Sequence, residues 1–594
     1  MQRSNAEAGE QTGEAPRGSP MPTAHGEEIQ ADLCIIGAGS GGLSLAASTA
    51  QLGLKVVLIE KASTYGGTSA VSGGGIWIPC NDQMPAAGFS DSEAEALTYL
   101  KALIGSDVPQ AKLEAYVRNA REMVRHMAQF DVRFRVVPRY PDYYPDKPGG
   151  KDGARSMQPA VVDGRELGEE FFRLRPAFPS TQVFGRIAMD QVEAHTLFAR
   201  SSGWLWLTLK LIWNYFTDFS WRRRTTRDRR LTMGQALVGA LRRAMLRDNV
   251  PLMLETGLES LVVEQGRVTG VAVTQNGRTL KLGARKGVVI ATGGFESSQE
   301  LRERYLPKPT QADWTAAPRG NVGDGLQAGL AVGAATGFMN LTWGAPTVMV
   351  PGMASATGIF VERSLPGSVC VNGRGQRFAN EAGPYGEFAS AMQADHAKTG
   401  STIPCWVVFD ARFRKNYPCG PFMPSGIMPD SKLPAEWRGA VYEKADTLDE
   451  LAAKIGVDAA GLKQTVAKMA EYAKAGVDPE FKRGGNAFDR YYADPRVKPN
   501  PCLGPIDQAP FYAIRLYPGE LGTKGGLVTD EAARVLRADG SVIEGLYAVG
   551  NCSAAVMGRT YAGAGATLGP AMTFAYLAAK DLAVVQSSSK RAAA

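Results

Sequence analysis

A glycine fingerprint between two apolar runs most strongly constrains the fold of this chain. Residues 33–36 are apolar and predict a buried parallel strand, which Gly37, Gly39 and Gly42 follow. This spacing lets the backbone approach a pyrophosphate at the start of a helix. Glu60 ends the next apolar run about 20 residues later, where a carboxylate accepts hydrogen bonds from ribose hydroxyls. The arrangement predicts a dinucleotide-binding βαβ unit.

A second glycine-rich stretch, residues 66–75, follows the acid and favours FAD as the dinucleotide. A Rossmann domain that binds NAD does not require a second loop of this kind. The alternative is a flexible surface loop, but Trp77 and Pro79 directly behind the stretch indicate a packed segment.

Length and charge leave room for a large soluble enzyme with one local basic patch. A chain of 594 residues can form two or more domains, and 44% hydrophobic and 21% charged residues are ordinary values for a globular protein. Six arginines and one aspartate in residues 222–230 supply +5 of the net charge of +7. These arginines lie beside Trp and Leu residues and not in a recognisable nucleic-acid-binding motif, so nucleic-acid binding has little support.

The first 28 residues and the cysteines indicate the compartment. Residues 1–28 are polar, rich in Gly, Pro, Ala and Glu, and lack an apolar core, which predicts a disordered tail and no signal peptide. The seven cysteines are scattered without any C-x-x-C spacing. This pattern argues against a metal site or a disulfide framework and favours a reducing cytoplasm.

The order of the predicted elements indicates one fold interrupted by another. Residues 91–130 have helical periodicity, and residues 287–295 form an apolar strand that ends in glycines. From about Phe338 to Gly519 the composition shifts toward Pro, Gly, Tyr and Met, and the nucleotide-binding pattern resumes near Gly522. We therefore expect an α/β protein with a doubly wound Rossmann-like FAD-binding domain and an inserted α+β domain.

An aromatic segment, residues 203–221, runs directly into the arginine cluster. It contains four of the nine tryptophans and is too short and interrupted to span ~30 Å of hydrocarbon. On a helix, Lys210, Asn214 and Thr217 or Asp218 would share one narrow polar face. Aromatic rings beside cationic side chains are typical of an interfacial membrane anchor, which we predict over residues 203–230. A subunit interface or a buried helix is the alternative.

Seven motifs together resemble the flavoproteins of the fumarate reductase and 3-ketosteroid dehydrogenase superfamily, and within it the 3-ketosteroid Δ1-dehydrogenases. They are residues 66–81, 140–145, 163–168, 291–296, 362–367, 377–385 and 557–572. The resemblance extends from about residue 31 to 580 and leaves out the tail and residues 203–230. It implies an FAD-binding domain of two segments, residues 29–345 and 523–594, and a catalytic domain over residues 346–522.

The resemblance also implies the roles of individual residues. The general base is expected at Tyr385. A tyrosine of the proline-rich loop, residues 138–146, is expected to assist it. We place this partner at Tyr143, with the adjacent Tyr144 as the alternative. Tyr561 and the backbone amide of Gly565 are expected to polarise the substrate carbonyl. Tyr140 and Phe360 are expected to contact the substrate. The expected FAD-binding residues are Gly37, Gly39, Gly42, Glu60, Lys61, Gly67, Thr68, Ser69, Ser72, Gly74, Ala291, Gly293, Asp324, Gly550, Asn551, Ala566 and Leu568.

Desaturation of the C1–C2 bond of a 3-ketosteroid would use these groups in two ways. The C2 proton becomes acidic only if the developing enolate oxygen is stabilised, which requires hydrogen-bond donors such as Tyr561 and Gly565. The base must accept that proton, but an unperturbed tyrosine has a pKa of ~10. We expect a neighbouring tyrosine to favour the phenolate, and an alkaline optimum. The C1 hydride would pass to the flavin.

Alternatives remain for the substrate and the setting. None of His25, His126, His195 and His396 lies in a glycine-rich motif, whereas the dicarboxylate reductases of the superfamily need His and Arg, so a neutral apolar substrate is favoured. A Δ4-(5α)-ketosteroid dehydrogenase, a reductase of an activated alkene and a membrane-attached flavin electron carrier are the other possibilities. We expect a cytoplasmic, peripherally membrane-bound enzyme that passes electrons to a quinone-like or dye-like acceptor and accepts sterols with a side chain, such as cholest-4-en-3-one.

Overall fold

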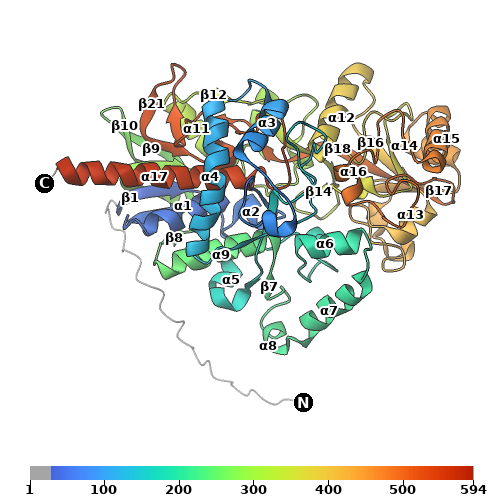
Figure 1. Cartoon of the computed structure of the whole chain (residues 1–594), viewed down its shortest axis with the longest axis horizontal. Helices are drawn as coiled ribbons and strands as arrows, with labels where there is room; N and C mark the ends of the chain where they lie inside the picture. The colour runs from blue at the N-terminus through green and yellow to red at the C-terminus, as the bar shows by residue number, and fades with distance from the viewer. Residues whose placement is uncertain (1–28, 593–594) are drawn as a thin grey trace, which may run out of the picture.

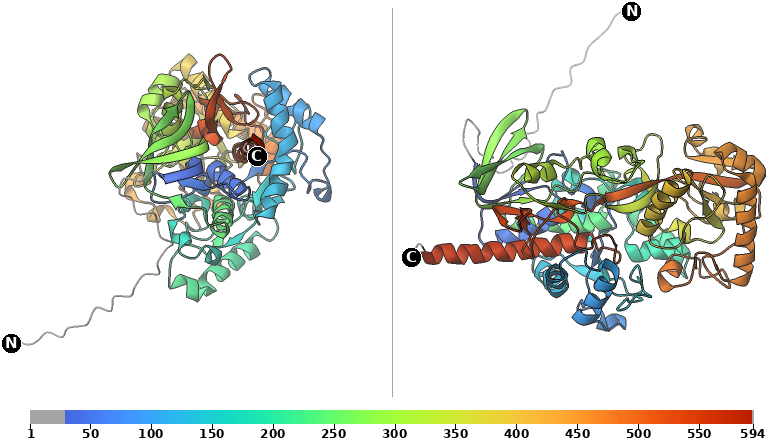
Figure 2. Two further views of the ribbon diagram at one scale, coloured as in Figure 1. Left: turned by 90° about the vertical axis from the view of Figure 1, so that its left-hand side faces the viewer. Right: turned by 90° about the horizontal axis from the view of Figure 1, so that it is seen from above.

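The computed structural model describes residues 29–592, and the side chains up to residue 584. The predicted disordered tail, residues 1–28, lies outside the described residues. Two sheets lie at opposite ends of an elongated molecule, as Figure 1 and the view from above in Figure 2 show. All seven cysteines are unpaired.

The first sheet is the predicted doubly wound nucleotide-binding sheet. Its main path has the order β20-β21-β11-β1-β2-β8, in which β1, β2, β8, β11 and β21 run parallel. The strands are β1 (Ile29–Ile36), β2 (Val56–Ile59), β8 (Leu252–Met253), β11 (Arg278–Ile290), β20 (Arg534–Leu536) and β21 (Val542–Ala548), with β9 (Thr256–Glu264) and β10 (Arg267–Gln275) as an antiparallel extension. Helices α1 (Ser40–Ala50), α9 (Met233–Arg247) and α17 (Leu568–Ala592) pack together beside it.

Strand β1 is apolar at consecutive positions because both faces of the sheet are covered. Leu33 and Ile35 belong to the hydrophobic core that includes α1 and α9. Cys34 and Ile36 belong to a separate core with β10 and β11. A parallel strand buried on both faces produces the continuous apolar run from which the sequence pattern predicted it.

The second sheet is antiparallel and has helices on both sides. Its order is β14-β13-β18-β16-β15, and β17 pairs with β18. The strands are β13 (Thr342–Val348), β14 (Thr357–Gly358), β15 (Ser368–Val371), β16 (Cys405–Phe409), β17 (Tyr442–Ala445) and β18 (Phe511–Thr523). Helix α12 (Tyr385–Thr399) contacts β13 and β18, whereas α14 (Leu448–Ile455) and α15 (Ala459–Ala475) contact β17, β18 and β15. This is the expected α+β arrangement.

Strands β13 and β18 carry the chain between the two parts. The predicted boundaries at residues 345 and 522 both fall inside these strands, and the strands pair antiparallel, with Ala345 opposite Gly519. The chain therefore leaves and re-enters the FAD-binding part through neighbouring strands. The boundaries remain a prediction, since both strands continue across them.

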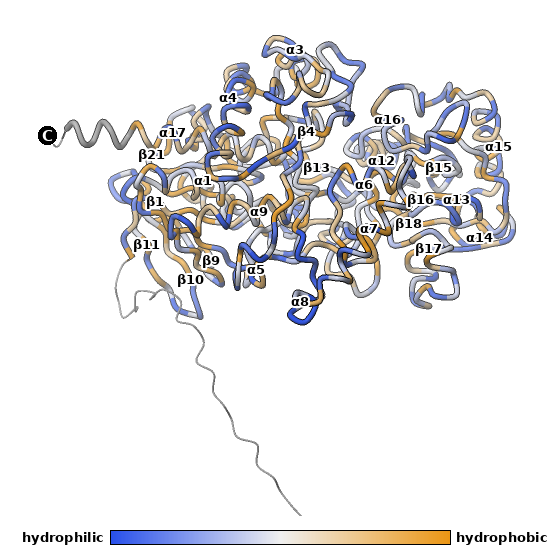
Figure 3. The backbone as a smooth tube through the Cα atoms, turned by 60° about the horizontal axis from the view of Figure 1, so that its bottom comes forward, coloured by the Kyte–Doolittle hydropathy of each residue, from blue (hydrophilic) through white to orange (hydrophobic). Residues whose placement is uncertain are grey.

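The aromatic segment, residues 203–221, forms two helices at the lower edge of Figure 1, and a third helix precedes them in the chain. The two are α7 (Trp204–Thr217) and α8 (Phe219–Arg222), and the third is α6 (Gln191–Phe198). Figure 3 shows hydrophobic colouring along α7 next to the hydrophilic chain at α8. Within residues 29–592 we find no helix whose length and apolarity would let it cross a bilayer.

Candidate active site

One cavity of about 760 Å³ brings the glycine-rich loops and the predicted tyrosines together. Its wall includes the loop after β1, the residues that follow β2 and β11, the proline-rich loop and the start of α12. Part of the wall comes from α6, through Gln191, Ala194 and Phe198. The cavity therefore lies between the two sheets and beside α6.

Two glycines of the fingerprint allow neighbouring backbone segments to pack in close contact. Gly37 has φ +105°, and a Cβ there would lie 2.4 Å from the carbonyl oxygen of Ala291. A Cβ at Gly42 would lie 2.0 Å from the carbonyl oxygen of Gly37. Only glycine fits either position. The carboxylate of Glu60 is fixed by the amides of Ala38 and Ala62, each at 3.0 Å, and faces the cavity.

Most of the expected FAD-binding residues line this cavity. They are Gly37, Gly39, Glu60, Lys61, Gly67, Thr68, Ser69, Ser72, Gly74, Ala291, Gly293, Asp324, Gly550, Asn551 and Leu568. Gly42 and Ala566 do not line it. Gly42 instead lets α1 pack on the loop after β1, and Ala566 is buried with its amide on the carbonyl of Gly563. Lys61 and Asp324 form an ion pair with each other beside the cavity.

Arg175 is a cavity residue that lies outside every glycine-rich motif. Its Nε atom is buried and has no hydrogen-bond partner in the described part of the chain. Burial lowers the pKa of Arg175, and the charge of Glu60 opposes this effect. A buried, unpaired N–H beside the dinucleotide cradle fits an acceptor on the cofactor, because unsatisfied buried donors are rare in folded proteins. No pattern in the sequence distinguishes this arginine from the others.

Three tyrosines from distant parts of the chain meet in the same cavity. The hydroxyl of Tyr143 donates a hydrogen bond of 3.0 Å to the hydroxyl of Tyr385. The ring centroids of Tyr143 and Tyr561 are 5.0 Å apart, and that of Tyr385 lies 5.6 Å from each of them. Tyr143 belongs to the proline-rich loop, and Tyr385 is the first residue of α12. Tyr561 belongs to the loop before α17.

The loop around Tyr561 places two donor groups close together. The hydroxyl of Thr567 donates to that of Tyr561 at 3.2 Å, and the amide of Gly565 also faces the Tyr561 hydroxyl. Gly565 lines the cavity with φ +96°, and a Cβ there would lie 2.5 Å from the backbone of Ile76. The Tyr561 hydroxyl and the Gly565 amide are therefore close enough to reach one oxygen atom.

Tyr144 lies in a different place from Tyr143, although the two residues are adjacent. Its hydroxyl donates a hydrogen bond of 2.7 Å to a carboxylate oxygen of Glu387, and its side chain is not part of the cavity wall. The contact with Tyr385 is made by Tyr143, which was the expected partner.

Aromatic side chains surround the three hydroxyls. Phe360 lies 5.2 Å from Tyr385 between ring centroids, and Tyr140 stacks on Tyr491 at 4.6 Å. Both expected substrate-contacting residues line the cavity. Phe488 and Tyr492 also line it, and neither was identified from the sequence. The surroundings suit a large apolar ring system with one polar end.

Burial raises the pKa of all three tyrosines. The pKa values of Tyr143 and Tyr385 lie well above 10, whereas that of Tyr561 is raised but hydrogen bonds from Thr567 and Gly565 oppose the effect. The hydrogen bond from Tyr143 lowers the pKa of Tyr385, as expected, but desolvation is the larger effect. The neighbouring tyrosine therefore favours the phenolate as expected, but burial outweighs this effect and the net pKa of Tyr385 is raised.

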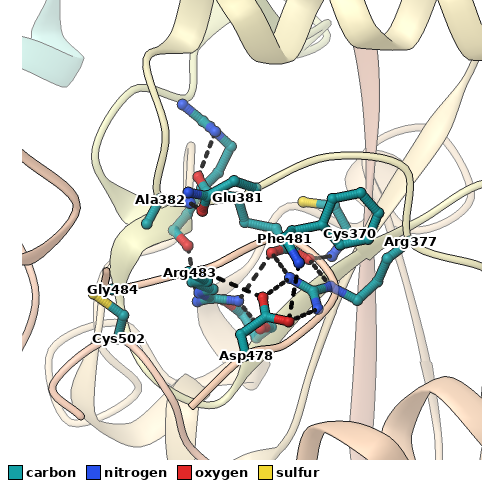
Figure 4. A network of polar contacts seen from close by, with 12 residues as sticks. Cys370, Arg377, Glu381, Ala382, Asp478, Phe481, Arg483, Gly484 and Cys502 are labelled. Atoms are coloured by element: carbon teal, nitrogen blue, oxygen red, sulfur yellow. Dashed lines mark hydrogen bonds and ion pairs between the residues drawn. The ribbon is translucent and has the colours of Figure 1, made fainter. Parts of the chain in front are cut away.

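A buried network of charges braces the loop that leads to Tyr385 (Figure 4). Arg377 donates to both carboxylate oxygens of Glu381 at 2.9 and 2.7 Å, and to both of Asp478 at 3.0 and 2.7 Å. These three side chains are at most 2% exposed. Arg363 donates to the carbonyls of Glu381 and Phe360. The network thus ties the loop before Tyr385 to the segment that carries Phe360.

Comparison with known proteins agrees with this geometry. A family model described as "FAD binding domain" matches residues 32–568. A 3-oxosteroid 1-dehydrogenase from Comamonas testosteroni is 42% identical over an alignment of 563 residues that covers 93% of this chain and 97% of the relative. The crystal structure of 3-ketosteroid Δ1-dehydrogenase from Sterolibacterium denitrificans, in complex with 1,4-androstadiene-3,17-dione, has a TM-score of 0.92 and 49% identity, and the match covers 94% of this chain and all of that one.

A more distant solved structure shares the fold alone. The 3-ketosteroid-Δ4-(5α)-dehydrogenase from Rhodococcus jostii RHA1 has a TM-score of 0.63 and 20% identity, with coverage of 94% of this chain and 98% of that one. Because the family model and the curated relative both cover most of the sequence, the cofactor is FAD. This chain belongs to the FAD-dependent 3-oxosteroid 1-dehydrogenase family.

Proposed function

We propose that this enzyme removes one hydrogen each from C1 and C2 of a 3-ketosteroid and leaves a C1–C2 double bond. The observation that carries the proposal is the convergence of Tyr143, Tyr385 and Tyr561 in an aromatic cavity that also contains the FAD-binding residues. A substrate with a carbonyl next to the reacting carbons would use such a set of phenols as base and carbonyl donors. The named activity of the relative from Comamonas testosteroni supports the same reaction.

Each tyrosine has a separate task in this proposal. Tyr561 and the amide of Gly565 hydrogen-bond the C3 carbonyl oxygen and stabilise the negative charge that develops there. The phenolate form of Tyr385, which the hydroxyl of Tyr143 stabilises through its 3.0 Å hydrogen bond, takes the C2 proton and becomes a neutral phenol. FAD, when bound, would supply the acceptor for the C1 hydride.

A neutral substrate is favoured by the lining of the cavity. Among the described residues that line it, none is a histidine, and the three tyrosines contact the aromatic rings of Phe360, Phe488 and Trp343 and the uncharged hydroxyl of Thr567. A dicarboxylate would need cations at this end of the cavity to offset its charge. A ketone with an apolar body requires only donors to its single oxygen.

We also propose that α7 and α8 bind an anionic membrane surface. Six large apolar side chains are 59–73% exposed along these helices: Leu205, Trp206, Leu209, Trp213, Phe216 and Phe219. Lys210 and Arg223 lie beside them, and neither has an ion-pair partner in the described part of the chain. Exposed rings next to cations are the composition of an interfacial helix.

The position of this surface supports apolar sterols as substrates. Helix α6 lines the cavity through Ala194 and Phe198 and precedes α7 directly in the chain. A sterol with an intact side chain, such as cholest-4-en-3-one, partitions into a bilayer. An enzyme with its cavity next to a membrane-facing helix could take the sterol from there. A quinone-like acceptor dissolved in the same bilayer would fit this location.

The experiment for the proposed reaction is a product assay with defined alternatives. Purified enzyme, a 4-en-3-one steroid and a dye acceptor should give the absorbance of the 1,4-dien-3-one. A saturated 5α-3-ketosteroid converted to the 4-en-3-one without further reaction would instead identify a Δ4-(5α)-dehydrogenase. Failure of any 3-ketosteroid to bleach the bound flavin would support a flavin electron carrier.

A further inference from the structure

Lys524 is a buried cation that the proposed reaction does not use. It follows the end of β18, and only 3% of the residue is exposed. Its Nζ atom donates a hydrogen bond of 2.5 Å to the carbonyl oxygen of Thr560, and no carboxylate in the described residues forms an ion pair with it. Burial lowers the pKa of Lys524 to about 7. The charge of Glu387 opposes this effect without forming an ion pair, and a buried ammonium group that lacks a paired carboxylate is costly, so its contacts require an explanation.

Both contacts of Lys524 lead to Tyr561. Thr560, whose carbonyl accepts the hydrogen bond, directly precedes Tyr561 in the chain. The ammonium also lies 4.6 Å from the centroid of the Trp343 ring, and the Tyr561 ring packs edge-on against Trp343 at 4.9 Å. Lys524 therefore holds the peptide before Tyr561 and the aromatic ring beside it.

The neighbours of Lys524 are themselves fixed in place. Trp343 donates a hydrogen bond of 3.1 Å from Nε1 to the side-chain oxygen of Asn551, which lines the cavity. The backbone amide of Lys524 donates to the carbonyl of Leu341, and its own carbonyl accepts from the amide of Ala555. Lys524 is not part of the cavity wall and cannot touch a substrate there.

We propose that Lys524 is a positioning residue, which sets the orientation of Tyr561 through the peptide before it and the Trp343 ring beside it. This inference rests on the proposed role of Tyr561 as a donor to the substrate carbonyl. A phenol held in a fixed orientation is a stronger donor to a developing enolate, because no reorganisation is needed when the charge appears. The contribution would therefore be larger in the transition state than in the bound substrate, and would change kcat more than KM.

The test is a double-mutant cycle that joins K524M with Y561F. K524M should lower kcat about tenfold or more and leave KM within about threefold, because an interaction made mainly in the transition state is lost. In the Y561F background, K524M should change kcat less than about twofold, because the residue through which it acts is already disabled. An equal loss in both backgrounds would overturn the proposal.

A second buried lysine provides the matched control. Lys112 is also buried, and its Nζ donates to the carbonyl of Thr529 at 2.8 Å and to the Thr529 hydroxyl at 2.7 Å, but it makes no contact with the three tyrosines. K112M should reduce the unfolding temperature as K524M does and leave kcat unchanged. If K112M lowers kcat as much as K524M, loss of stability explains both and the positioning role is wrong.

Two further results keep the outcome clear. If K524M does not fold with FAD bound, K524Q replaces it in the cycle, since glutamine keeps an N–H donor toward Thr560 but removes the charge. K524R retains both a charge and a donor and should recover part of kcat. If Y561F alone has wild-type kcat, the role of Tyr561 in the proposed function fails first, which is a different result from an additive cycle.

Discussion

The Tyr143 hydroxyl donates to the Tyr385 hydroxyl across 3.0 Å, and so connects the proline-rich loop with the first residue of α12. As the donor, Tyr143 lowers the pKa of Tyr385, whereas the same bond raises its own. The pair is therefore asymmetric, and Tyr385 is the member that can best carry negative charge. This asymmetry supports Tyr385 as the base and Tyr143 as its helper.

Y143F and Y144F should separate the two adjacent tyrosines. Y143F removes the hydrogen bond to Tyr385, so kcat should fall about tenfold or more. Y144F removes only a hydrogen bond to exposed Glu387, so kcat should change less than about twofold. Steady-state rates with a 4-en-3-one steroid measure both. Equal losses in the two variants would contradict the assigned partner.

The pH dependence follows from the raised pKa of Tyr385. Burial holds Tyr385 protonated at neutral pH, so the fraction of phenolate grows as the pH rises, and kcat/KM should increase up to about tenfold per pH unit. In Y143F the pKa of Tyr385 is higher still, and the rising limb should move to higher pH. A flat profile between about pH 6 and 10 would count against a tyrosine base.

Gly565 should not tolerate a side chain. With φ +96° and a Cβ 2.5 Å from the backbone of Ile76, G565A must displace the loop that carries Tyr561, so kcat should fall about 100-fold. G277A is the control, because Gly277 also has positive φ but its Cβ would meet nothing within 4 Å. It should cost about 1 kcal/mol of stability and leave kcat unchanged. Similar kcat values for the two variants would exclude a steric role for Gly565.

R175M tests the cavity arginine through cofactor affinity and not through turnover. Loss of an N–H that has no acceptor in the protein should weaken FAD binding about tenfold if the cofactor is its acceptor. R173M removes a neighbouring exposed arginine that pairs with Glu170 and should leave the FAD dissociation constant unchanged. Fluorescence titration of the apoprotein gives both constants, and an unchanged value for R175M would remove Arg175 from the FAD site.

The double variant W206S/W213S tests the membrane surface better than a deletion of residues 204–230. Leu211, Tyr215 and Trp221 in that stretch are buried, so a deletion would disturb the core, whereas Trp206 and Trp213 are 73% and 70% exposed. The double variant should stop co-floating with anionic vesicles and keep its activity on detergent-solubilised steroid. I427S, at another exposed apolar residue, should still float.

Two other outcomes would contradict the membrane surface. Continued flotation of W206S/W213S would show that α7 is not the binding helix. Dissociation of an oligomer by the same variant, without any effect on vesicle binding, would show that this face joins subunits.

The nucleotide-binding sheet could be predicted from the sequence because its signals are local. A buried parallel strand is apolar at consecutive positions, and a tight turn such as that at Gly37 requires glycine, so both leave a pattern over a few residues. The convergence of Tyr143, Tyr385 and Tyr561 is not local. It was expected only from the resemblance to a family, and the adjacent Tyr144 could not be excluded without coordinates.

Features that depend on burial could not be predicted. The direction of the pKa shift of Tyr385 follows from the desolvation of its whole surroundings, which no spacing encodes. The role of Lys524 and the unpaired Nε of Arg175 likewise depend on which backbone groups lie nearby. For α7 the helix was predicted but not its buried side. Leu211 and Tyr215 face inward, so apolar and polar residues are exposed together.

Anaerobic reduction of the enzyme by cholest-4-en-3-one tests the central claim most directly. Wild-type enzyme should bleach its flavin and form the 1,4-dien-3-one in equal amount, whereas Y385F should retain FAD and bleach about 10³-fold more slowly, because the base for the C2 proton is missing. Wild-type bleaching by Y385F would contradict a tyrosine base, and a wild-type flavin that stays oxidised with every 3-ketosteroid would contradict the proposed reaction.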